Sequence, residues 1–245
     1  MSNESVISRR NWLLNAVEPS TQKRFADKLR LVELTKGQVL LGQGQEVDAV
    51  YFPEGALIGL VSAMASGDTV QTAMLGWDGA LGVFEACGSR RSAFLAEVQV
   101  SGAAWRMPAA AYREMFAASE ALRINVHKYV ELLLTEARQH VACNALHSVS
   151  SRLSRSILEA LERSQDNRRL PVTKDVLAEM IGVQRTTASS SIATLERAGA
   201  LTNSRGSIEV DNPALLERKA CSCRKAMQVA RREIYQTHED VCDEA

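Results

Sequence analysis

The sequence lacks an apolar run long enough to cross a membrane. Its longest charge-free stretch near the front, residues 56–67, contains glycine and serine and falls short of the roughly 20 apolar residues that a membrane helix needs. The first ten residues mix acidic and basic side chains, and no sustained apolar segment follows them, so no signal peptide is evident. We therefore expect a cytoplasmic protein with no membrane partner.

Cysteine is scarce and irregularly placed. The five cysteines form no regular framework, and an odd number in a long chain is typical of a reducing compartment. Cys221 and Cys223 lie too close together for an ordinary zinc knuckle, and no second pair lies near them in the sequence. No histidine precedes His127, which argues against a histidine-held haem in the first domain. We predict no metal ligands and no certain cofactor.

The sequence also lacks the residue constellations of common enzymes. It shows no nucleophile–base pair, no metal cluster and no Walker-type phosphate loop. We therefore predict that the protein is not an enzyme.

The net charge is zero, but charge is unevenly distributed along the chain. Residues 148–232 contain 15 Lys and Arg against 9 Asp and Glu, a net charge of +6, and the remainder carries −6. Such asymmetry is typical of a basic nucleic-acid module joined to an acidic domain. The alternative is chance clustering on a solvated face.

The pattern of apolar residues divides the chain, which is long enough for about two domains. Up to residue 30 it predicts one or two short helices. Between residues 32 and 107, apolar runs alternate with glycine-containing turns, which predicts a β-sandwich or barrel. From Pro108 the pattern is helical. We expect an α+β fold with these parts: a β domain (1–118), a long helix and hinge (119–146), a helical domain (147–220) and a C-terminal tail (221–245).

Residues 173–210 predict two short helices, a tight turn and a hairpin, the layout of a winged helix-turn-helix. Thr173 can cap the first helix, Lys174–Ile181, by accepting a backbone N–H bond. Gly182 can adopt the positive φ of the turn. In the second helix, residues 184–198, one face is apolar: Ala188, Ile192 and Leu195. The alternative is an ordinary helical hairpin with a polar face.

The start of the second helix is where a recognition helix presents side chains to the major groove. Arg185 is the strongest candidate, because arginine can bond guanine O6 and N7 with two donors. Arg205 lies at the turn between two predicted strands, 201–203 and 207–210, from which it can reach a phosphate or the minor groove; otherwise it is only solvated. The predicted DNA-binding residues are Thr173, Gln184, Arg185, Thr186, Ser189, Ser190 and Arg205.

The long helix predicted from residue 120 carries a heptad-like stripe, with steps of four and three. Such a stripe favours helix–helix packing, and a homodimer would supply the two-fold axis that paired DNA readers need. The alternative is a helix packed only on its own domain. Leu132 and Leu134 lie off the stripe and predict a second buried face. The stripe comprises Val126, Val130, Leu133, Ala137, His140 and Asn144, of which the two polar residues are interpreted as register residues rather than metal ligands.

The next predicted helix, residues 148–161, has one apolar face. Arg152, Arg155 and Glu159 lie off that face. The polar segment 163–170 is interpreted as a loop.

The order of these motifs resembles the Crp/Fnr family of bacterial transcription regulators. The resemblance covers about residues 12–220 and implies a cyclic-nucleotide-binding-like β-roll of jelly-roll type, a dimerisation helix and a DNA-binding domain, with RNA polymerase as a further partner. Segments 143–149 and 220–223 look like a subgroup of that family. The motifs are Gly37, Gly44, Val50-Tyr51-Phe52, Gly55, Gly82-Val83-Phe84-Glu85 and Arg91-Ser92-Ala93, followed by the long helix and the winged module.

The resemblance also suggests where an effector would bind. In members that bind cyclic AMP, a Gly-Glu pair holds the ribose and an Arg-Ser pair holds the cyclic phosphate. Arg91 and Ser92 match the second pair, with one residue inserted before them, but Ala80 stands at or near the position of the Glu. This argues against cyclic AMP and leaves another nucleotide, a different effector or no ligand; a surface ion pair of Arg91 with Glu85 or Glu97 is the structural alternative. Iron–sulfur-sensing members carry an N-terminal cysteine cluster, and here no cysteine precedes Cys87.

The carry-over to the recognition helix is partial. Arg185 matches a base-contacting arginine of the family, whereas Thr186 stands where many members have Glu and Ser190 where many have a second Arg. The operator should therefore differ from the family consensus. We predict a homodimeric, sequence-specific DNA-binding transcription regulator; the alternative is a nucleotide-sensing module that acts through a protein partner rather than DNA.

Overall fold

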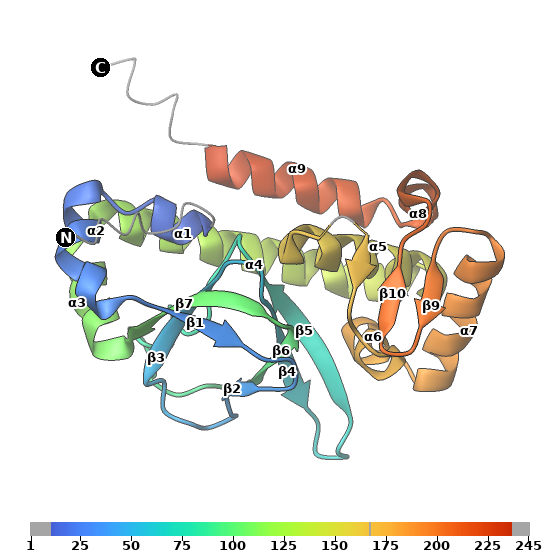
Figure 1. The fold of residues 1–245 in the computed structure, drawn as a ribbon, viewed down its shortest axis with the longest axis horizontal. Helices are drawn as coiled ribbons and strands as arrows, with labels where there is room; N and C mark the ends of the chain where they lie inside the picture. Colours follow the sequence, from blue (N-terminus) through green and yellow to red (C-terminus); the bar gives the residue numbers. More distant parts are fainter. Residues whose placement is uncertain (1–10, 167, 237–245) are drawn as a thin grey trace. The chain divides into compact units, whose positions relative to one another are not determined.

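The computed structural model describes residues 11–166 and 168–236, whose elements are labelled in Figure 1. The chain forms two compact units. One comprises residues up to 62 and residues 74–126, and the other comprises residues 63–73 and those from 127 onward. The prediction about a signal peptide concerns residues 1–10, which lie outside the described residues.

Strands of the N-terminal part of the chain form two sheets. One sheet has the order β1-β7-β3 and the other the order β2-β6-β4-β5, with antiparallel pairing of β7 to both its neighbours. This confirms that the N-terminal part of the chain forms β-sheets, as predicted. The strands are β1 (Arg30–Leu34), β2 (Val39–Leu41), β3 (Ala49–Pro53), β4 (Leu57–Ala63), β5 (Thr69–Leu75), β6 (Leu95–Val100) and β7 (Gly102–Pro108).

Short helices precede and follow these strands, as the amphipathic pattern predicts. Asn11 caps the first one: its side-chain oxygen accepts from the N–H groups of Leu13 and Leu14, and its amide nitrogen donates to the carbonyls of Pro53 and Gly79. One fully buried side chain therefore ties the start of the chain to the β domain. The elements are α1 (Trp12–Asn15), α2 (Pro19–Phe25), η1 (Ala26–Lys28) and α3 (Ala109–Ala118).

The predicted long helix is α4 (Glu120–Leu146). Leu132 is 1% exposed, which confirms a buried face off the predicted stripe, whereas Leu134 is 50% exposed and is not buried by contacts within this chain. Val141, seven residues after Leu134, is 72% exposed. Within this chain, α4 therefore presents an apolar stripe, Leu134 and Val141, to the surface. This stripe is displaced by one residue from the predicted one.

Helix α5 (Val149–Ser164) follows the cap residue Ser148 and is buried on more than its apolar face. Arg152, Arg155 and Glu159, which lie off that face, are each less than 7% exposed. The reason is tertiary: α4 and α9 (Cys223–Gln236) supply polar partners for the second face. The segment predicted as a C-terminal tail thus contains a helix.

The second face of α5 is held by a network of buried ion pairs, here called the polar core. Glu136 of α4 accepts from Arg163 at 2.6 Å and from Arg231 of α9 at 3.2 Å. Arg155 donates to Glu159 at 2.6 Å and bonds the His140 ring at 2.9 Å. Buried charges are tolerated when they are paired and hydrogen-bonded in this way.

His140 and Asn144 of the predicted stripe contact α5 of their own chain. His140 bonds Arg155, and the Asn144 side-chain oxygen accepts from Arg152 at 2.7 Å. Burial, together with the nearby Arg155 and Arg163 charges, lowers the pKa of His140 to about 3. His140 is therefore neutral in the folded chain at neutral pH.

Candidate nucleic-acid interface

The first helix of the predicted module is α6 (Lys174–Ile181). The Thr173 hydroxyl accepts from the Val176 N–H at 3.3 Å, as predicted for its cap. Gly182 ends the helix with a φ of +62°, which a glycine adopts without steric cost. Cap and turn residues thus determine where α6 begins and ends.

The second helix is α7 (Arg185–Arg197). Ala188, Ile192 and Leu195 are at most 1% exposed, which confirms the predicted apolar face. Gln184 is the N-cap but makes no side-chain capping bond. The N–H groups of the first turn therefore donate no hydrogen bond to the side chain of the cap residue. Helix N-termini with such groups favour anions such as phosphate.

The other face of α7 is polar and open to solvent. Arg185, Thr186 and Ser190 are exposed, and Ser189 is half-buried. Sequence reasoning omitted Thr187, which is also exposed and lies beside Thr186. Since Ser and Thr are mediocre helix formers, this face is better suited to polar contacts than to helix stability.

The predicted wing is present as a hairpin of β9 (Thr202–Ser204) and β10 (Ser207–Glu209). Its turn is Arg205-Gly206, with Gly206 at a φ of +77°, and the Arg205 side chain is exposed. A third strand, β8 (Arg169–Leu170), pairs with β10. The prediction of a loop over 163–170 is therefore wrong for these two residues, because their pairing partner lies almost forty residues later. It is also wrong for Arg163 and Ser164, which belong to the end of α5.

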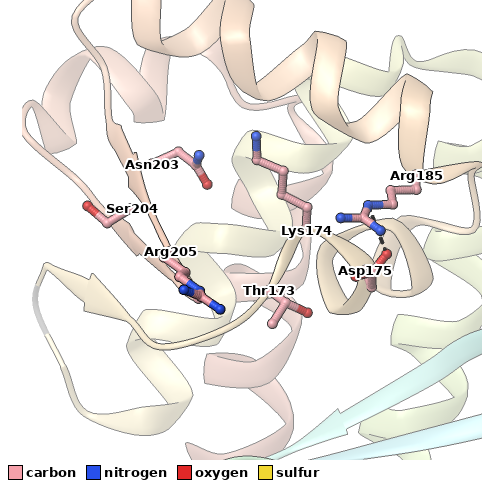
Figure 2. A pocket seen from close by; sticks show the side chains of 8 residues that line it. Thr173, Lys174, Asp175, Arg185, Asn203, Ser204 and Arg205 are labelled. Carbon is pink, nitrogen blue, oxygen red and sulfur yellow. Dashed lines mark ion pairs between the residues drawn. The ribbon is translucent and has the colours of Figure 1, made fainter.

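The start of α6, the start of α7 and the wing surround one surface hollow of about 400 Å³. Figure 2 shows Arg185 and Asp175 on one side of it and Asn203, Ser204 and Arg205 on the other. Its lining includes three cations, Lys174, Arg185 and Arg205, and one acid, Asp175. The other lining residues are Thr173, Asn203, Ser204 and Gly206.

One ion pair lies within the hollow. Arg185 Nε is 3.2 Å from Asp175 Oδ1, and the two side chains are 68% and 60% exposed. An exposed pair of this kind contributes little to stability. The contact joins the Nε edge of the Arg185 guanidinium to the Asp175 carboxylate.

The structure brings three of the predicted DNA-binding residues to the hollow, namely Thr173, Arg185 and Arg205. Thr186, Ser189 and Ser190 lie instead along the first two turns of α7, and Gln184 directly precedes this helix. Sequence reasoning missed Lys174, Asn203 and Ser204. Their positions next to the helix cap and next to the wing turn were the signal that could have identified them.

The predicted effector residues form bonds within the β domain. Arg91 is exposed and its Nη1 donates to the Gly44 carbonyl at 2.9 Å. The buried Ser92 hydroxyl donates to the Phe94 carbonyl at 2.7 Å, which closes a local turn. Ala80 is buried at 3% exposure. Arg91 and Ser92 thus hold the loop around residues 42–46 and the turn at 92–94.

Among the described residues, no helix combines the length and the apolar character that a membrane span requires. Residues 151–219 match the Crp-like helix-turn-helix domain family. No curated protein matches the chain significantly. The family match covers the hollow and both helices of the predicted module, which confirms the helix-turn-helix.

Several solved structures share the fold. FixK2 from Bradyrhizobium japonicum matches with a TM-score of 0.67 at 13% identity, covering 79% of this chain and 98% of that one. A protein from Eubacterium rectale assigned to the Crp/Fnr family of transcriptional regulators gives 0.66 at 16%, covering 86% and 99%. The c-di-GMP-responsive global regulator CLP from Xanthomonas campestris gives 0.63 at 13%, covering 79% and 99%.

Proposed function

We propose that this chain, which has the fold of Crp/Fnr transcription regulators and carries a Crp-like helix-turn-helix domain, reads a two-fold-related DNA site as a homodimer. The observation that carries the proposal is the hollow between α6, α7 and the wing, with Lys174, Arg185 and Arg205 at its wall. Phosphates neutralised by such cations supply affinity, and side chains at the start of α7 supply sequence readout.

Arg185 is the base-reading residue in this proposal. Its guanidinium lies at the first position of α7, where recognition helices contact base edges. Asp175 holds the Nε edge, so the two terminal amino groups can face guanine O6 and N7. Thr186, Ser189 and Ser190 follow in the first turns of α7 and contact bases or phosphates. Gln184 and Thr173 lie beside them, directly before α7 and α6.

The surface stripe of α4 supports the homodimer. Leu134 and Val141 are large apolar residues that are 50% and 72% exposed, and they are seven residues apart. That separation is one heptad, the spacing that a paired helix would cover. Two copies joined there would read half-sites about one helical turn, roughly 34 Å, apart.

An effector that shifts the balance between two arrangements of the dimer would act through the β domain. Arg91 and Ser92 remain the candidates for an anionic group, and the change would require Arg91 to exchange its bond to Gly44 for the ligand. Ala80 in place of a carboxylate argues against cyclic AMP. That CLP is named as responsive to c-di-GMP supports a search among other nucleotides. RNA polymerase is the proposed protein partner, the cytoplasm the proposed location, and no enzymatic activity is proposed.

The experiment compares DNA binding of the full chain with that of Arg185→Ala at the protein's own promoter, by mobility shift over a range of salt concentrations. Arg218→Ala is the matched control, because Arg218 is an exposed arginine of the same domain on α8 (Pro213–Lys219). We expect Arg185→Ala alone to lose specific binding. Equal, weak binding by all three at low salt would contradict DNA reading and favour the protein-partner alternative.

The homodimer has a separate test in analytical ultracentrifugation of Leu134→Glu. A charge on the exposed stripe should yield monomers, whereas Glu131→Gln, at an exposed position one turn earlier, should leave the dimer intact. A monomeric wild-type chain at micromolar concentration would overturn the homodimer.

A further inference from the structure

Four potential metal ligands converge at the end of α4. Cys143 lies in the last turn of α4, His147 directly follows this helix, Cys221 lies in the link between α8 and α9, and Cys223 is the first residue of α9. Their donor atoms, three Sγ and one imidazole nitrogen, all lie within 4.8 Å of one another. The sequence separates the two pairs by more than seventy residues, so only the fold joins them.

The separations suit a single tetrahedral ion. The Sγ atoms of Cys143 and Cys221 are 3.5 Å apart, and Cys223 Sγ is 3.4 Å from His147 Nδ1. Zinc–sulfur bonds of about 2.3 Å in tetrahedral geometry place ligand atoms about 3.8 Å apart. Small side-chain rotations are enough to reach that spacing from the observed range.

The surroundings suit a thiolate-rich site. The three cysteines are at most 7% exposed, and Met227 packs beside them. Gln139 donates its side-chain N–H to Cys223 Sγ at 3.0 Å, and the Arg155 charge acts on both Cys143 and Cys221. Three thiolates around a divalent ion carry one net negative charge, which a neighbouring cation and an N–H donor stabilise.

We propose that Cys143, His147, Cys221 and Cys223 bind one zinc ion, here called the hinge zinc site. Three thiols and an imidazole in a closed set are the donors of structural zinc sites. The ion would link the end of α4 and the connection to α5 with the connection from α8 to α9. Its role is to hold the helix-turn-helix domain at one orientation to the end of α4; this role, but not the metal site, rests on the proposed DNA binding.

A disulfide is the competing chemistry for the same thiols. Linking Cys143 to Cys221 would require their sulfurs to close from 3.5 Å to about 2.05 Å, with two electrons passed to an external oxidant. It would leave Cys223 and His147 unused. The close approach of all four donors favours a metal ion.

The test measures bound metal in the full chain purified without chelators and after addition of zinc to chelator-treated protein. We expect one zinc per chain, lost in Cys143→Ser and in Cys223→Ser. Cys87→Ser is the matched control, because Cys87 is an exposed cysteine of the β domain, and it should keep the metal. No zinc in either preparation, or zinc retained by both variants, would overturn the site, as would a Cys143–Cys221 disulfide in protein kept under reducing conditions.

Cobalt substitution keeps the proposal testable if a serine variant fails to fold. Tetrahedral Co²⁺ bound by thiolates has ligand-field bands in the visible spectrum, and His147→Cys should retain the ion with a shifted spectrum because sulfur replaces nitrogen. An unchanged spectrum would exclude His147 as a ligand. Gln139→Ala should weaken zinc binding by about tenfold or more, since it removes the N–H donated to Cys223.

DNA binding gives the readout for the hinge role. Removing zinc should weaken operator binding by wild-type protein, and adding zinc should restore it. Equal affinity with and without bound zinc would overturn the hinge role. A zinc-loaded protein that fails to bind any DNA would instead contradict the proposed function and leave the metal site standing.

Discussion

The polar core and the hollow both contain arginines paired with carboxylates, but the environments of these pairs differ. In the polar core, Arg155 and Arg163 are less than 5% exposed and each lies 2.6 Å from a carboxylate oxygen. In the hollow, Arg185 is two-thirds exposed and its pair is longer, at 3.2 Å. Many of the arginines that give residues 148–232 their net charge of +6 are therefore buried in ion pairs within the chain. The part that is available to DNA is the smaller set of exposed cations.

This comparison predicts that removing a charge lowers stability in the polar core and changes DNA binding in the hollow. The largest expected effect is in the polar core. Glu136→Ala removes the carboxylate shared by Arg163 and Arg231, and loss of one partner of a buried pair costs about 3–5 kcal/mol. Urea unfolding of the variant measures it. Glu131→Ala, at an exposed position on the same helix, should be nearly neutral; equal effects of the two would refute the structural role.

The polar core should also make stability depend on pH. The pKa of His140 is lowered to about 3 by burial and by the charges of Arg155 and Arg163, whereas in the unfolded chain it is about 6.5. Between these values the unfolded state binds the extra proton, so stability falls as pH decreases below 6.5. The loss from this residue should approach about 2 kcal/mol by pH 5.

The measurement is the free energy of unfolding at pH 7 and pH 5 for wild type and for His140→Gln. Glutamine can still bond Arg155 but does not titrate in this range. The variant should lose less stability on acidification than the wild type does. Parallel pH profiles would show that His140 is charged, or exposed, in the folded chain.

In the hollow, a charge change should affect DNA binding and leave stability almost unchanged. Arg205→Ala should weaken binding to all sequences about equally and lower the slope of log affinity against log salt by about 1, because it removes one phosphate contact. Filter binding from low to moderate salt measures this slope. A change confined to one operator position would instead assign Arg205 to base readout.

The smallest effect is expected for Asp175→Asn. The exposed pair with Arg185 contributes at most about 1 kcal/mol, so the melting temperature should hardly move. DNA affinity should fall modestly, because asparagine lacks the charge that holds the Nε edge of Arg185. A rise in affinity would show that removing a negative charge from a surface that meets phosphates outweighs the orientation of Arg185.

The helix-turn-helix was predictable because its signals are local. Thr173 and Gly182 determine the ends of α6 by a side-chain cap and a left-handed turn, and the spacing of Ala188, Ile192 and Leu195 determines the buried face of α7. Each signal acts within one or two helical turns. The resemblance of residues 12–220 to Crp/Fnr regulators was likewise visible in the order of short motifs.

The differences from expectation concern contacts between distant segments. Leu134 follows the pattern of a buried residue, yet it is half exposed within this chain, because its burial depends on what contacts α4. Arg169 and Leu170 belong to a polar segment that becomes a strand only because β10 pairs with it. No local rule indicates either outcome, because both depend on which remote segment lies alongside.

The sequence alone therefore determined the class of fold, the limits of the two helices of the helix-turn-helix and the place of Arg185 at the start of the second one, since caps, turns and helical periodicity act over a few residues. The tertiary structure decided which arginines are buried in the polar core and which remain exposed around the hollow. It also brought Cys143 and His147 to Cys221 and Cys223. Side chains separated by more than seventy residues become neighbours only when α4, α5 and α9 pack together, and that packing determines both the charge available to DNA and the proposed hinge zinc site.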